Sequence, residues 1–177
     1  DMEKADEYFK KALELNKGIK NGRTDFFIYR SIGLMKSYME EFEEAKDAYS
    51  KADSLLSNAK ISTADKYGFF YTKGYLHYEM GELEQAESYY RKVIDSLHFF
   101  GTAFQHRVQT DYGTTLCSLG KIDECVRYFE KLRPIVEKDS LNATMLNFSE
   151  EYSEALVLAG RNKEAKDWIV KTRIYYM

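Results

Sequence analysis

Three histidines are the side chains in this sequence most suited to binding a metal or moving a proton. His77, His98 and His106 fall on different expected helices or loops, and none has a partner three or four residues away, as a helical metal site requires. The sequence contains no glycine-rich phosphate loop, no Gly-x-Ser-x-Gly elbow and no Cys-x-x-Cys pair. It therefore predicts no catalytic residue, no metal site and no cofactor, and it indicates that the chain is not an enzyme.

The two cysteines, Cys117 and Cys125, flank one expected turn between helices. Two cysteines are too few for a disulfide framework. Buried free cysteines act as small apolar residues, and we expect two free thiols here in preference to a bridge.

The distribution of charge and the length of the apolar runs argue against two classes of partner. The net charge is −3 with both signs mixed along the chain, whereas nucleic-acid binding needs a concentrated basic face. No apolar run approaches the roughly 20 residues that cross a bilayer. We therefore expect neither direct nucleic-acid binding nor membrane insertion by this segment.

Small residues recur at intervals of about forty, each followed four places later by a large apolar residue. The small residues lie 40, 41, 39 and 40 positions apart. A spacing of four places both members of a pair on one face of a helix. The five pairs are Ala5/Phe9, Ala45/Tyr49, Ala86/Tyr90, Cys125/Phe129 and Ala165/Ile169.

A second series of small residues, Gly33, Gly74, Gly113 and Ser153, precedes the last four pairs by 12 residues each time. Between the two series stands a turn glycine at 81, 120 and 160, with Glu40 at the corresponding place of the first full repeat. The pattern predicts antiparallel helix pairs in which the two small residues face each other. The large residue would fill the wedge beside the next pair.

This pattern resembles the tetratricopeptide repeat family, most closely over residues 74–90. The period of about 40 exceeds the usual 34, and Tyr29, Phe70, Gln109 and Ser149 replace the family's first-helix tryptophan. The resemblance implies an all-α, right-handed superhelical solenoid. Nine helices are expected, at roughly 2–16, 25–39, 42–57, 63–80, 82–98, 102–119, 121–137, 142–158 and 161–176, and Pro134 should kink or end the seventh.

The expected organisation is one solenoid over residues 1–177. It comprises a half repeat at 1–20 and full repeats at about 25–59, 62–100, 102–139 and 141–177. Because the half repeat lacks a first helix, we expect a segment excised from a longer protein. An alternative is that the bare face of the incomplete N-terminal repeat forms a homodimer.

The resemblance implies a scaffold that binds a protein or peptide in the concave groove lined by first helices. The groove residues expected here are Arg30, Tyr38, Tyr71, Tyr75, Arg107, Asp111, Asn147, Glu150 and Glu154. Tyr71, Tyr75 and Tyr78 form a stripe that either meets the partner or packs between first helices. The alternative function is the sensor or regulatory part of a bacterial transcription regulator or kinase, and an enzyme comes a distant third.

Overall fold

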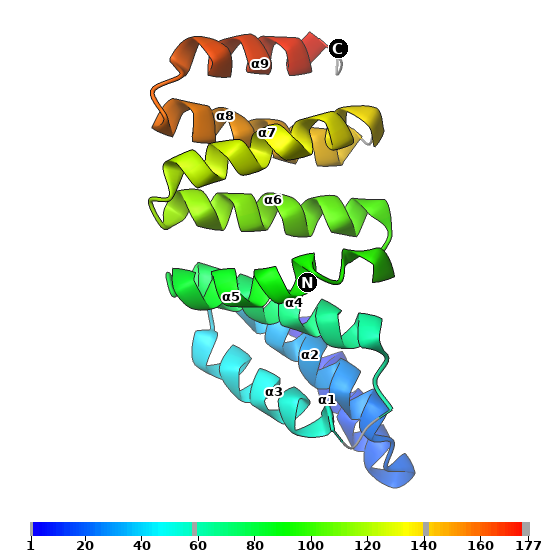
Figure 1. Ribbon diagram of the computed structural model, residues 1–177. Helices are drawn as coiled ribbons and strands as arrows, with labels where there is room; N and C mark the ends of the chain where they lie inside the picture. The colour runs from blue at the N-terminus through cyan, green and yellow to red at the C-terminus, as the bar shows by residue number, and fades with distance from the viewer. Residues whose placement is uncertain (1, 58–59, 140–141, 175–177) are drawn as a thin grey trace. The chain divides into compact units, whose positions relative to one another are not determined.

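The computed structural model describes residues 2–57, 60–139 and 142–174, which form nine α-helices and one 3₁₀ helix and contain no strand (Figure 1). The expected all-α class is confirmed. The largest difference from the expected bounds is in α5, which stops at Ile94 and is followed by a separate 3₁₀ turn, Leu97–Phe99. The α-helices are α1 (Met2–Ile19), α2 (Gly22–Tyr38), α3 (Phe42–Leu55), α4 (Thr63–Glu79), α5 (Leu83–Ile94), α6 (Thr102–Ser118), α7 (Ile122–Asp139), α8 (Asn142–Leu158) and α9 (Asn162–Ile174).

The chain divides within α5 into two compact units, residues 1–89 and 90–177. In the first unit, α2 packs against α1, α3 and α4 around a core that includes Phe26, Tyr49 and Phe69. In the second unit, α6, α7 and α8 pack against one another and α9 packs on α8 (Figure 1). Phe129 and Phe148, with ring centres 5.6 Å apart, join α7 to α8 in that core. The expectation of one continuous solenoid stays a prediction.

The turn inside each full repeat has the same hydrogen bonds in all four copies. The N–H groups of Glu41, Glu82, Lys121 and Arg161 donate to the carbonyl five residues earlier, at 2.8 to 3.0 Å. The residue before each donor is left-handed, with φ of 75°, 73° and 74° at Gly81, Gly120 and Gly160 and 59° at Glu40. This is the hydrogen-bonded ending that favours glycine after a helix. The predicted turn glycines are therefore confirmed, and Glu40 adopts their conformation despite its Cβ.

In two repeats a glycine of the first helix leaves room for an aromatic ring of the second helix. A Cβ on Gly33 would lie 2.3 Å from two ring carbons of Tyr49, and a Cβ on Gly113 would lie 2.7 Å from Cζ of Phe129. The sequence predicted that each glycine faces the small residue of the second helix. In these two repeats the ring of the large residue occupies the space at the glycine.

Pro134 lies inside α7, which continues to Asp139, so the helix does not end at the proline, and a kink there stays a prediction. Proline removes one helical N–H and crowds the preceding turn. Pro134 itself is exposed, but Leu132 and Val136 on either side of it are 5% and 2% exposed. Burial of these two side chains holds the helix past the proline.

The expectation of two free thiols is also wrong. Cys117 at the end of α6 and Cys125 on α7 form a disulfide, with Cα atoms 5.3 Å apart. The tight turn between these helices brings the two residues within the ordinary range for a bridge.

Candidate partner-binding surface

In the first unit the face predicted to bind a partner carries a pair of tyrosines from adjacent first helices. Tyr38 of α2 and Tyr75 of α4 have ring centres 5.0 Å apart. Tyr38 is 53% exposed, whereas Tyr71, Tyr75 and Tyr78 are half-buried. Contact between first helices therefore accounts for part of the tyrosine stripe. Tyr38, which lies next to this stripe, is the most exposed of these four tyrosines.

Arg30 is less accessible than a groove cation would be. Its guanidinium lies over Gly68 of α4, 3.2 Å from the position that a Cβ would occupy there. Burial lowers the pKa of Arg30, while the neighbouring Tyr49 and Asp65 act in the opposite direction. Burial likewise raises the pKa of Tyr49 to about 12, and it outweighs the hydroxyls of Thr72 and Ser37, which lower it. Arg30 thus forms part of the α2–α4 interface.

In the second unit the predicted residues split between an exposed face and an interhelical contact. Arg107 of α6 and Asn147, Glu150 and Glu154 of α8 are exposed, and Asp111 is half-buried. The hydroxyl of Thr114 on α6 donates to Glu151 on α8 at 2.7 Å, which joins the two first helices. Among the predicted groove residues of α8, the exposed carboxylates are therefore those of Glu150 and Glu154, whereas the neighbouring Glu151 is engaged.

Two of the three histidines, His77 and His106, hold structural positions. Nδ1 of His77 lies 2.6 Å from Oε2 of Glu82 across the turn after α4, and its ring stacks on Tyr89 of α5. His106 is 2% exposed within α6. Among residues 2–57, 60–139 and 142–174 no cluster of three His, Cys, Asp or Glu side chains could hold a metal ion. Within the same residues, none of the helices has the length and apolar character needed to span a bilayer.

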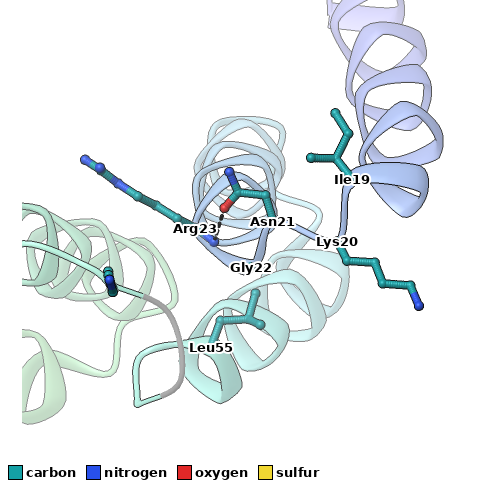
Figure 2. Close-up of a pocket in the computed structure, with 7 residues that line it drawn as sticks. Ile19, Lys20, Asn21, Gly22, Arg23 and Leu55 are labelled. Carbon is teal, nitrogen blue, oxygen red and sulfur yellow. Dashed lines mark hydrogen bonds between the residues drawn. The ribbon is translucent and has the colours of Figure 1, made fainter.

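An open cleft of about 560 Å³ in the first unit was not predicted from the sequence. Figure 2 shows Ile19 and Leu55, from different helices, with the start of α2 between them. The side-chain oxygen of Asn21 accepts the N–H groups of Arg23 and Thr24 at 3.1 and 3.4 Å, so the N-terminus of α2 is already capped (Figure 2). The lining residues are Ile19, Lys20, Asn21, Gly22, Arg23, Leu55 and Lys60.

The cleft was missed because it joins the α1–α2 turn to residues at the far end of the next hairpin, which lie well apart in the sequence. Lys20 in that turn has a φ of 52°, a left-handed conformation that its residue type does not indicate. Arg23 of the cleft lies 3.7 Å from the carboxylate of Asp65. The cleft is thus a weakly basic hollow with apolar walls.

Comparisons with known proteins agree with this geometry. The sequence profile of the family described as "Tetratricopeptide repeat" matches residues 1–18 and 67–96. A search of curated protein sequences finds no match.

Among solved structures, TPR-like repeats described as those of a kinesin light chain in Podosopora anserina match with a TM-score of 0.79 at 12% identity. The match covers 98% of this chain and 86% of that one. A second structure of those repeats gives 0.78 at 11% identity, with 99% and 87% covered. Aspartyl phosphate phosphatase F from Bacillus subtilis gives 0.78 at 15% identity over 93% of this chain and 44% of that one. These likenesses show the repeat fold.

Proposed function

We propose that this chain, which is built of tetratricopeptide-type repeats, binds a protein or peptide through the solvent-facing side of its first helices. The observation that carries the proposal is the tyrosine pair of the first unit, with Tyr38 53% exposed beside Tyr75. Tyrosine combines a large apolar ring with a hydrogen-bonding tip and loses little rotamer entropy on binding. Such side chains dominate the energetics of many protein interfaces.

The chemistry of the partner differs between the two units. The tyrosine pair favours an apolar or aromatic side chain with a polar neighbour. In the second unit Glu150 and Glu154 are exposed one turn apart on α8, which favours lysine or arginine. Arg107 on α6 is an exposed cation among the predicted groove residues of the same unit and would bind an acidic group. We infer apolar positions in a segment that binds the first unit and basic positions in one that binds the second.

A peptide library displayed on phage and selected on the intact chain tests this proposal. Selected peptides should lose at least about tenfold in affinity, or roughly 1.4 kcal/mol, when Tyr38→Ala is combined with Tyr75→Ala. Basic peptides should lose a similar factor with Glu150→Lys and Glu154→Lys, and their binding should weaken as salt rises. Fluorescence polarisation with labelled peptides gives the affinities.

Matched controls lie on second helices of the second unit. Ile135 on α7 is 48% exposed and Asp167 on α9 is exposed. Ile135→Ala and Asp167→Lys remove an apolar side chain and reverse a charge away from the proposed face, so both should leave affinity within about twofold. Peptides that bind all four variants equally would place the binding surface elsewhere. The regulatory alternative would use the same face, and the complete sequence of the gene would decide it.

A further inference from the structure

The tyrosine pair of the first unit lies where two first helices end. Tyr38 is the last residue of α2, and Tyr75 lies one turn before the end of α4 at Glu79. The ring centres are 5.0 Å apart, and the ring planes are tilted by 53°. Tyr38 is 53% exposed, so Tyr75 covers it only in part. The pair therefore offers aromatic surface to a partner.

Glu79 adds a carboxylate to the same side of α4. It is exposed and follows Tyr75 by four residues, a spacing that brings two side chains onto one face of a helix. It also holds the place in its repeat that Tyr38 holds in the repeat before, five residues after the glycine of the first helix. Because α2 packs against α4, Tyr75 has the ring of Tyr38 on one side and the carboxylate of Glu79 one turn away.

The carboxylate of Glu79 is not neutralised by a neighbouring cation. Among the residues that the structure describes, none forms an ion pair or a hydrogen bond with this carboxylate. The lysine nearest to it on α4 is Lys73, which is bound to Asp53 of α3. The lysine nearest to the ring pair on α2 is Lys36, which is bound to Glu41. Both lysines therefore have an acidic partner, and the acid of Glu79 has no basic one within the described chain.

The ends of the two helices add negative potential at the same place. The last turn of an α-helix carries about half a negative charge on its outermost carbonyl groups, which favours nearby cations. Helices α2 and α4 both end beside the ring pair, at Tyr38 and Glu79. The guanidinium of Arg30 lies over Gly68, seven residues before Tyr75 and thus about 10 Å away along α4. We therefore expect the surface around the pair to be negative.

We propose that Tyr38, Tyr75 and Glu79 form a cation-binding site that takes one arginine or lysine side chain of the partner segment. The inference rests on the proposed function, because it names the residue that the first unit recognises in its partner. A cation is attracted to the negative face of an aromatic ring. The aliphatic stem of the same side chain packs on the rings and supplies one of the apolar positions inferred above for this unit. Arginine fits best, because its planar guanidinium stacks on a ring and can donate two hydrogen bonds to one carboxylate.

The site differs from the acidic face of the second unit. There the places of the ring pair are held by Ser118 and Glu154. A cation bound to that unit would meet carboxylates without this ring pair. The two faces therefore bind cations by different means, and the backbone signals that a bound cation perturbs tell them apart.

The probe is N-acetyl-arginine methylamide, and N-acetyl-citrulline methylamide is its neutral counterpart of nearly the same shape. Each compound is titrated into the intact chain labelled with ¹⁵N. The chemical shifts of the backbone amides at 37–41 and 76–82 report binding at this site. The arginine compound should bind there at least about fivefold more tightly than the citrulline compound, because citrulline lacks the positive charge.

Two substitutions test the two parts of the site. Tyr38→Leu keeps an apolar side chain without a ring, and Glu79→Gln removes the charge. Each should lower the preference for arginine over citrulline at least about twofold, and the double variant should bring it below about twofold. The controls are Tyr8→Leu, at a tyrosine of α1 that is 69% exposed, and Glu84→Gln, at an exposed glutamate of α5. Both controls should keep the preference of the parent chain, and all variants should keep its helical circular dichroism, since the changed side chains are exposed.

Three results would overturn the inference. The first is equal affinity of the arginine and citrulline compounds at these amides. The second is a preference for arginine that Tyr38→Leu and Glu79→Gln both leave intact. The third is a set of shifts confined to α8 around Glu150 and Glu154, since the cation would then bind to the second unit alone.

Failure of the cation site and failure of the proposed function give different results. Selected peptides that lose affinity with Tyr38→Ala and Tyr75→Ala, together with equal binding of the two compounds, would keep the proposed function and refute the cation site. Binding of the arginine compound as expected, together with selected peptides that ignore both tyrosines, would keep the cation site and refute the proposed function of the first unit.

Discussion

Gly33→Ala provides the sharpest test of how the hairpins pack. A new Cβ would lie 2.3 Å from Cδ1 and Cε1 of Tyr49 and 2.9 Å from its Cζ, whereas carbon atoms in contact prefer about 3.5–4.0 Å. Tyr49 is 2% exposed, so its ring has nowhere to move without disturbing the core. Overpacking of this kind costs about 1–3 kcal/mol, and a clash this short belongs at the upper end.

Alanine also favours a helix over glycine by about 1 kcal/mol, which offsets part of that cost. The net expectation is a loss of about 2 kcal/mol in the free energy of unfolding, or about 4–8 °C in Tm for a chain of this length. Gly113→Ala should lose about 1 kcal/mol, because its Cβ would lie 2.7 Å from Phe129. Gly18→Ala is the matched control. It lies in α1 with nothing within 4 Å of its Cβ, and it should gain up to about 1 kcal/mol.

Urea unfolding followed by far-UV circular dichroism measures all three variants under one condition. Combining Gly33→Ala with Tyr49→Leu should recover about 1–2 kcal/mol relative to the sum of the single effects, because the smaller side chain makes room for the Cβ. The reasoning fails if Gly33→Ala is neutral or as stabilising as Gly18→Ala. Additivity of the two substitutions would show that the cost arises away from Tyr49.

Three further perturbations test separate features. Glu40→Gly should stabilise the chain by about 0.5–1 kcal/mol, because φ is 59° there, and Gly81→Ala should do the reverse; equal urea midpoints would contradict this. The Tyr49 pKa is raised from 10.0 to about 12. Its contribution to the free energy of unfolding is therefore complete below pH 10 and is lost as pH rises through 12. Tyr49→Phe should remove up to about 3 kcal/mol of that decline in unfolding scans from pH 8 to 12. Replacing Cys117 and Cys125 by serine should cost about 2.5 kcal/mol for a loop of this length; dithiothreitol should produce the same shift in the parent chain and none in the variant.

The periodic features of the fold could be read from the sequence, because each depends on a residue type at a fixed spacing. The turn glycines are an example, since only a residue tolerant of positive φ fits after these helices. A serine before a helix is a second example, since Ser62 caps the start of α4. The side-chain oxygen of Ser62 accepts the N–H of Asp65 at 3.1 Å, and its hydroxyl donates to the carboxylate of Asp65 at 2.6 Å.

Features that depend on tertiary contact could not be read in this way. Pro134 breaks a helix by its local propensity, but the burial of Leu132 and Val136 overrides that propensity. Arg30 lies at a position expected to face the groove, yet its side chain turns onto Gly68 of the next first helix, where the absence of a Cβ leaves room. Helix periodicity gives the direction of a Cα–Cβ bond, and a side chain as long as arginine can still choose between solvent and a neighbouring helix.

The shared hydrogen bonding of the four turns has a consequence for how such a chain can change in length. Each turn sets the first helix against the second at the same register, twelve residues from small residue to small residue. Removing residues 41–81 would join Glu40 to Glu82 and place α5 after α2 with that register kept. Recombination between two turns would therefore exchange whole helices and keep the register in which the two helices of a hairpin pack. Genes for such chains can grow or shrink by one hairpin at a time, as expected where each repeat contacts only its neighbours.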